Sequence, residues 1–282
     1  MNVATTSRTA LTRSFPLVLL LASAALACKD DAVAAGAPPL TKEGKTDRAV
    51  IESAGDVVIA PTGVYTVTAV GNPGSVTGTV TLSAPLPIQP PVSTGADSAL
   101  CGASVLDESL VQQGTGLGSV VVWLDDIRSG KPLPTERRIE LESERCRLLP
   151  RVQAAVVGSA VNVLGHDVFR QHLRWMSGGE QSPRAEILLS RNEQVIPTGL
   201  PAKAPGMVVV RDVNHPWPRA FLAVFDHPYF AVTKPDGSFA IDGVPPGSYT
   251  LHAWHERTKV AKEKVTVSAG GAGRVEVRLE GR

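Results

Sequence analysis

Short apolar runs with period-two alternation dominate the chain from about residue 75 onward. Val76, Val80 and Leu82 alternate with threonines. Side chains two residues apart on a strand share a face, so this alternation predicts a strand with one buried face. The run 120–124, Val-Val-Val-Trp-Leu, is apolar at every position, which predicts a central strand covered on both faces.

The same pattern predicts further strands along the middle of the chain. They are expected around Ile139 and Leu141, on either side of Gly158 within 152–164, and at 187–189, 208–210 and 221–225. No helical pattern of useful length alternates with these strands, which excludes a doubly wound α/β fold and favours an antiparallel sandwich. The 26 glycines and 22 prolines in 282 residues agree with many short strands joined by turns.

The last sixty residues show hairpins most clearly. The turn 234–237, Lys-Pro-Asp-Gly, combines a proline that presets one dihedral angle with a glycine that accepts positive φ. A second turn is predicted at 244–247. Leu251 and Ala253 then face one side of the following strand, while His252 and Trp254 face the other. Two alternating strands around the glycine-rich turn 270–273 complete the pattern.

Two family resemblances follow from these residues. The segment Thr-Lys-Pro-Asp-Gly-Ser-Phe to Trp-His-Glu resembles the carboxypeptidase regulatory-like (transthyretin-like) module, over roughly 220–282. The upstream part is similar to a cupredoxin-like periplasmic family, often labelled plastocyanin-like or methylamine-utilisation-like. The matching positions are Cys101-Gly102, Gly116-Leu117 before 120–124, Cys146 before Pro150, His215-Pro216-Trp217 and 226–230.

The resemblances imply an all-β chain. A Greek-key β-sandwich of cupredoxin-like fold is expected at 75–219, followed by a small carboxypeptidase regulatory-like β-sandwich at 220–282. Residues 1–27 are expected to be a signal peptide and residues 28–74 a flexible tether.

The N-terminal residues predict export from the cytoplasm. Arg8 and Arg13 precede the apolar run 15–27 and then Cys28, the order of an export signal. The run is shorter than the roughly 20 residues that a stable membrane span needs. The residues before Cys28 resemble the lipobox of bacterial lipoproteins, with the leucine one place late, and they also suit ordinary signal peptidase.

Three cysteines occur in the chain, Cys28, Cys101 and Cys146, and an exported protein rarely keeps an odd thiol. Lipidation of Cys28 would use one cysteine and leave Cys101 and Cys146 to form a disulfide in an oxidising compartment. The alternative is that Cys101 and Cys146 are buried free thiols. We therefore expect a lipid-anchored protein of the cell envelope, facing the periplasm or the outside.

The cupredoxin-like resemblance implies a copper ion held by two histidines, a cysteine and a methionine. The second histidine falls on His215, but the thiolate position holds Asp212 and the axial position holds Pro218. The first histidine position holds Arg170, with His172 two residues further on. A blue-copper couple needs a thiolate, so the donor set predicts a fold without this copper.

All six histidines lie between His166 and His255. His215, His172 and His227 with Asp212 could form a weaker nitrogen and oxygen site for copper or zinc. In the alternative interpretation, these histidines pack at strand ends and bond backbone groups. No cofactor is therefore expected, with copper as the alternative.

A second candidate site is aromatic. The residues concerned are Trp217, Tyr229, Phe230 and Trp254, with Phe221 beside them. An exposed aromatic strip on a sandwich could bind a sugar ring or a partner protein, whereas the same residues could belong to the core.

The remaining sequence argues against other classes. A formal net charge of +1 provides no broad basic field for nucleic acid. The chain has neither a Gly-x-Ser-x-Gly elbow nor a His-Glu-x-x-His motif. The expected function is a non-enzymatic envelope lipoprotein that binds or supports another component. The alternatives are a copper-binding or electron-transfer protein around His215 and a carbohydrate-binding accessory module.

Overall fold

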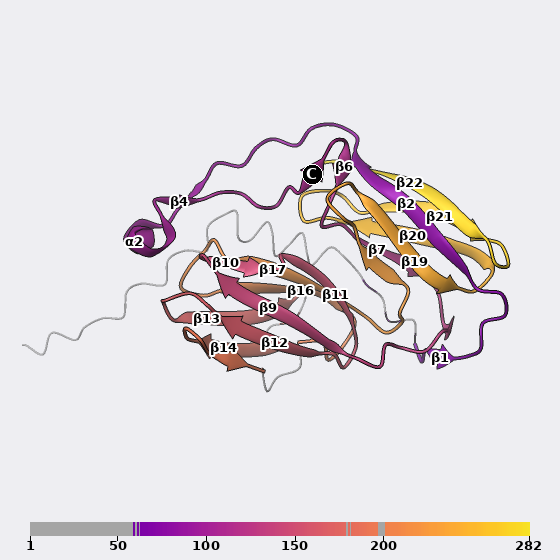
Figure 1. Cartoon of the computed structure of the whole chain (residues 1–282), viewed down its shortest axis with the longest axis horizontal. Helices are drawn as coiled ribbons and strands as arrows, with labels where there is room; N and C mark the ends of the chain where they lie inside the picture. Colours follow the sequence, from indigo (N-terminus) through magenta and orange to yellow (C-terminus); the bar gives the residue numbers. More distant parts are fainter. Residues whose placement is uncertain (1–58, 60, 62, 179, 181, 197–200) are drawn as a thin grey trace, which may run out of the picture. The chain divides into compact units, whose positions relative to one another are not determined.

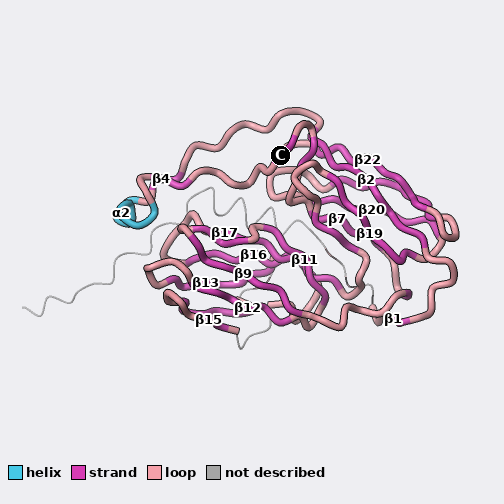
Figure 2. The backbone as a smooth tube through the Cα atoms, viewed as in Figure 1, coloured by secondary structure: helices cyan, strands magenta, loops and turns pink. Residues whose placement is uncertain are grey.

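The computed structural model describes residues 59, 61, 63–178, 180, 182–196 and 201–282. In these residues the chain is almost entirely strands and loops (Figures 1 and 2). No helix among them is long and apolar enough to cross a bilayer. The expected signal peptide, Cys28 and most of the expected tether lie outside the described residues.

One β-sandwich combines early and late segments of the chain, and we call it the split sandwich. Its first sheet has the order β18 (Phe230–Val232), β7 (Val121–Asp125), β20 (Gly247–Trp254), β21 (Ala261–Val267). Its second sheet has the order β19 (Ser238–Val244), β2 (Gly74–Leu82), β6 (Gly116–Leu117), β5 (Gln112–Gln113). The C-terminal strand β22 (Ala272–Leu279) pairs in parallel with β2. Figure 1 shows indigo β2 among these yellow and orange strands.

The second β-sandwich lies between β8 (Ser129–Gly130) and β18 in the sequence, and we call it the inserted sandwich. Its first sheet has the order β10 (Arg147–Leu149), β9 (Arg138–Glu144), β12 (Ala160–Gly165), β15 (Gln194–Val195). Its second sheet has the order β11 (Val152–Val156), β17 (Arg219–Phe225), β16 (Gly206–Asp212), β13 (Gln171–Ser177), β14 (Ala185–Leu189).

The run 120–124 forms a strand that is covered on both faces, as its composition predicts. Val122 and Leu124 of β7 belong to the core of the split sandwich. Val121 and Trp123 face the opposite way and join a second cluster with Phe221 and other residues of β16 and β17. Strand β17 likewise contributes alternate residues to this cluster and to the core of the inserted sandwich. Continuous apolar runs therefore mark the two sheets that pack against each other.

The boundary expected between residues 219 and 220 does not coincide with the sheets. Strands β2 and β7 come from the region assigned to the cupredoxin-like domain, yet they pair with β19, β22, β18 and β20. Strand β17 lies across the expected boundary and pairs with β16 and β11 of the inserted sandwich. Strands that are distant in the sequence pair where their faces are complementary. A domain boundary drawn at one point of the sequence therefore cannot predict which strands pair.

A long excursion, residues 84–111, separates β2 from β5, and we call it the arm. It contains β3 (Val92–Ser93), the 3-10 turn Gly95–Asp97, α2 (Ser98–Cys101) and β4 (Ser104–Val105). Figure 2 shows it as a loop that runs out to the short cyan helix and returns. The first described strand, β1 (Thr66–Val67), pairs in parallel with β8.

Candidate functional site

His215 lies in the turn between β16 and β17 and is held by Asp212, the last residue of β16. The His215 Nδ1 atom is 2.6 Å from Asp212 Oδ2. The other carboxylate oxygen, Oδ1, accepts hydrogen bonds from the backbone N–H groups of His172 and Asn214, at 3.2 and 2.9 Å. The Asp212 side chain is completely buried. Asp212 is therefore a structural acceptor that orients the His215 ring.

Aromatic rings and a second carboxylate enclose the rest of His215. Its ring centroid lies 4.7 Å from that of Phe169 and 5.2 Å from that of Trp217. Its Nε2 atom is 3.5 Å from Asp97 Oδ2, which belongs to the arm. The two ring nitrogens thus face two different carboxylates, and His215 links the inserted sandwich to the arm.

The other proposed metal ligands lie elsewhere. The His172 ring contacts Glu186, which also accepts a hydrogen bond from Arg174 Nε at 2.9 Å. The His227 Nδ1 atom accepts the backbone N–H of Tyr229 at 3.1 Å. Of the proposed set His172, Asp212, His215 and His227, the structure brings together only the side chains of Asp212 and His215.

The remaining histidines also have partners within the fold. The His255 Nε2–H donates to the Ser109 carbonyl oxygen at 2.8 Å. The His252 Nε2 atom lies 3.2 Å from Asp125 Oδ2, and the His166 Nε2 atom lies 3.6 Å from Glu142 Oε2. Of these three contacts, only that of His255 is with a backbone group, whereas His252 and His166 face carboxylates.

The residues at the copper positions do not fit a blue-copper ion. Asp212 and Pro218 offer a hard carboxylate and no donor where a soft thiolate and thioether are needed. Cys101 and Cys146, whose Cα atoms are 5.7 Å apart, form the expected disulfide, so neither sulfur is a thiolate. Across the described part of the chain, no three His, Cys, Asp or Glu residues form a group that could hold a metal ion.

The disulfide joins the arm to the β9–β10 hairpin. Arg145 and Cys146 form its two-residue turn, and both have positive φ, 52° and 63°, as a type I′ turn requires. The Cys146 backbone N–H donates to Asp167 Oδ1 at 3.0 Å, which supports this conformation. The arm is thereby held beside the His215 end of the inserted sandwich.

The proposed aromatic strip is not a surface. Tyr229 is buried in the core of the split sandwich. Trp254 is buried against Phe221 in the cluster between the sandwiches, with ring centroids 5.3 Å apart. Phe230 is half-buried and belongs to the same cluster. Of the two interpretations, the burial of Tyr229 and Trp254 agrees with the core and not with an exposed strip, and Trp217 is half-buried beside His215.

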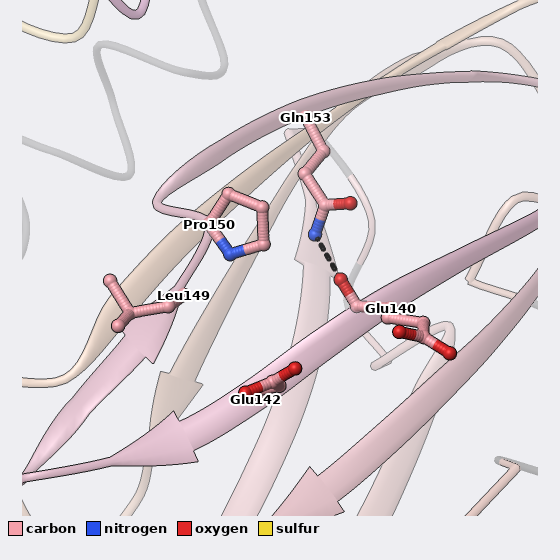
Figure 3. Close-up of a pocket in the computed structure, with 5 residues that line it drawn as sticks. All are labelled: Glu140, Glu142, Leu149, Pro150 and Gln153. Atoms are coloured by element: carbon pink, nitrogen blue, oxygen red, sulfur yellow. Dashed lines mark hydrogen bonds between the residues drawn. The ribbon is translucent and has the colours of Figure 1, made fainter.

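A hollow lies where β9, the end of β10 and β11 come together (Figure 3). Glu140, Glu142, Leu149, Pro150 and Gln153 line it. The Gln153 side-chain amide donates to the Glu140 backbone oxygen at 2.8 Å. The hollow therefore offers two carboxylates and an apolar rim, without a convergent set of catalytic groups.

Comparison with known families supports the C-terminal module. Residues 206–280 match the carboxypeptidase regulatory-like domain, so the match starts at β16 and continues through β22. No curated protein matches the chain.

Solved structures with some similarity include copper proteins. A reduced tryptophan-to-tyrosine mutant of amicyanin is 12% identical, covers 32% of this chain and 85% of its own, and has a TM-score of 0.27. A Cu(I) methionine-to-alanine mutant of amicyanin is 12% identical, covering 33% and 96%, with the same TM-score. A copper-containing nitrite reductase from Thermus scotoductus SA-01 is 19% identical, covers 43% and 27%, and has a TM-score of 0.28. TM-scores this low carry no argument about a shared site.

Two contacts of the structure were not predicted from the sequence. Asp97 was not expected beside His215, since 118 residues separate them in the sequence. Arg151 and Glu256 form a buried ion pair with Nε–Oε1 and Nη2–Oε2 distances of 2.6 and 2.8 Å. Neither contact has a local sequence signal, because each depends on how distant loops meet.

Proposed function

We propose that this chain is a non-enzymatic lipoprotein module of the bacterial cell envelope that binds or supports another envelope component. The observation that carries the proposal is the fully buried Asp212 carboxylate bonded to His215 at the position where the family resemblance implies a copper thiolate. A carboxylate in this position orients the imidazole and supplies no soft donor. The site is therefore a structural element of a cupredoxin-like sandwich.

The second support is the regulatory-like module. Carboxypeptidase regulatory-like domains are typically extracellular or periplasmic and are not catalytic. In this chain the matched residues include strands of both sandwiches. This arrangement suits a structural or binding role.

Copper loading tests the metal-free part of the proposal. The purified full chain, incubated with Cu(II) and passed through a desalting column, should retain much less than one copper per chain and show no intense visible band. The physical reason is the lack of a thiolate in the donor set. His215→Ala and the control His166→Ala should give the same low copper content as the native chain. Stoichiometric copper with an intense band, lost only in His215→Ala, would establish the copper-protein alternative.

Membrane fractionation tests the anchor. If Cys28 carries the lipid, Cys28→Ser should move the protein from the membrane fraction to the soluble fraction, because the acyl chains that hold it are absent. Immunoblotting of both fractions measures the shift. Lys42→Ser, in the same expected tether, is the control, since it changes one residue of the segment and leaves Cys28 and the disulfide in place. A Cys28→Ser protein that stays in the membrane fraction contradicts lipid anchoring.

A further inference from the structure

The arm is fixed firmly at its base, where its two ends meet the loop that follows β20. Arg257 of this loop donates to Asp107 Oδ2 at 3.0 Å and also to the Pro87 carbonyl oxygen. The His255 Nε2–H donates to the Ser109 carbonyl oxygen at 2.8 Å. The Arg257 and Asp107 side chains are only 12% and 19% exposed. The base of the arm is therefore part of the packed fold.

The outer part of the arm, residues 92–105, is a small hairpin that bonds mainly to itself, and we call it the tip. Its strands β3 and β4 pair with each other. The Thr94 hydroxyl donates to the Gly102 carbonyl oxygen, and the Asp97 backbone N–H donates to the Thr94 carbonyl oxygen at 3.0 Å. Thr94 is buried, whereas every other residue of the tip is exposed or half-exposed. A segment that buries so little surface opens at a low free-energy cost unless something else holds it.

Two links tie the tip to the inserted sandwich. One is the Cys101–Cys146 disulfide, which spans 45 residues of sequence, and the other is the 3.5 Å contact between Asp97 Oδ2 and His215 Nε2. The Asp97 side chain is 32% exposed, so solvent weakens its attraction to the imidazole. The disulfide limits the conformations that the tip can reach, and it thereby keeps Asp97 close to His215. The covalent link fixes the tip, and the contact with His215 depends on it.

The disulfide can be reached from the arm side. Cys101 is the last residue of α2 and is half-buried, while the residues before it, 98–100, are exposed. Cys146 is only 2% exposed. Thiol–disulfide exchange requires that an attacking thiolate reach one of the two sulfur atoms. The Cys101 sulfur is therefore the expected point of attack.

We infer that the Cys101–Cys146 disulfide is a redox-sensitive latch, which a dithiol reductant opens to release the tip and free the Nε2 side of His215. The oxidised bond is the closed state, as expected in an oxidising compartment. Opening leaves the His215 ring bonded to Asp212 and packed beside Phe169 and Trp217, with its second nitrogen accessible. The inference goes beyond the proposed function, because it concerns a change in the arm that neither copper binding nor lipid anchoring alters.

The opening reaction is a two-step exchange with the dithiol. One thiolate of the reductant attacks the Cys101 sulfur, the Cys101–Cys146 bond breaks, and Cys146 leaves as a thiolate that takes up a proton. The second thiolate of the reductant then attacks the reductant sulfur of the mixed disulfide, and Cys101 leaves and takes up a proton in the same way. The two cysteines gain two electrons and two protons, and the dithiol is oxidised to a disulfide.

Hydrogen–deuterium exchange of the purified full chain, measured by mass spectrometry with and without dithiothreitol, tests the latch. Reduction should speed exchange in peptides of the tip by about tenfold or more, because a segment with little buried surface opens once its cross-link is cut. Exchange in 107–111 and in β16 should stay unchanged, since the base keeps its bonds to Arg257 and His255. A gain of two hydrogens in the intact mass shows that the disulfide is reduced.

Two variants separate the disulfide from the contact with His215. Cys101→Ser cuts the cross-link permanently and should exchange like the reduced native chain. Its His215 ring should also react faster with diethyl pyrocarbonate, while the exposed His166 ring reacts at an unchanged rate. Asp97→Asn removes the carboxylate and keeps the disulfide, so exchange in the tip should stay within about twofold of the native rate.

Four outcomes would overturn the inference. They are a folded chain whose disulfide dithiothreitol does not reduce, a reduced chain whose tip exchanges as slowly as before, an Asp97→Asn effect as large as that of reduction, and an equal rise of exchange in β16. The last outcome would make the disulfide a staple of the whole inserted sandwich.

Discussion

Replacing Glu256 with glutamine is expected to lower the free energy of unfolding by about 3–5 kcal/mol, the range for breaking one side of a buried ion pair. The Arg151 and Glu256 side chains are only 17% and 4% exposed, and two short hydrogen bonds join them. Burial alone would lower the pKa of Arg151, but the Glu256 carboxylate outweighs it and the pKa is raised. Without the carboxylate, the arginine keeps its charge in a site that water reaches poorly. Urea unfolding followed by tryptophan fluorescence measures the loss.

An exposed ion pair provides the matched control. Lys259 and Glu280 are 3.3 Å apart, with side chains 66% and 68% exposed. Glu280→Gln should change the unfolding free energy by less than about 1 kcal/mol, because solvent screens such pairs. The double variant Arg151→Met, Glu256→Leu should recover most of the stability, since it removes both charges of this buried pair. Equal losses for Glu256→Gln and Glu280→Gln would contradict the importance of burial.

The second large effect is acid sensitivity through His227, amounting to about 3 kcal/mol between pH 7 and pH 4. Burial lowers the pKa of His227 to about 4 from its ordinary 6.5, against weaker opposing attraction from Asp226 and Asp125. The unfolded chain therefore takes up a proton at a higher pH than the folded chain. The stability contributed by neutral His227 is complete above about pH 6.5 and is lost as the pH falls toward 4. Below that value both states are protonated and no further loss follows.

His227→Asn separates this contribution from other titrating groups. The asparagine oxygen can accept the Tyr229 N–H that His227 Nδ1 accepts in the native protein, and it does not titrate. The difference in unfolding free energy between pH 7 and pH 4 should shrink by about 3 kcal/mol, whereas exposed His166→Asn should leave it nearly unchanged. An unchanged pH dependence in His227→Asn would rule out this histidine as the source.

Much of the fold was accessible from the sequence because strand patterning is local. Alternation in 76–82 predicted β2, and the apolar run 120–124 predicted a strand covered on both faces. The break at Gly158, where φ is 82°, separates β11 from β12 as expected. Counting cysteines in a chain that we expect to be exported also favoured the Cys101–Cys146 disulfide.

The candidate site was accessible only in part. The sequence identified His215 and the carboxylate three residues before it, and thus the unsuitable copper donors. It also placed His172 and His227 in the same set, and it interpreted Tyr229 and Trp254 as a possible surface. Side-chain direction at a strand end depends on which neighbour covers it, and the buried positions of Tyr229 and Trp254 follow from sheets formed by distant segments.

The sequence by itself determined the all-β class, most strand positions and the absence of a thiolate at the copper position, since these follow from residue type and spacing, and it favoured the disulfide that the structure contains. Only the tertiary structure decided that β2 and β7 join the C-terminal strands and that Asp97 meets His215. Each of these depends on the register and partner of strands far apart in the chain. The register and partner of each strand depend on the burial and pairing of the whole sheet, and the sequence of a single segment does not determine them.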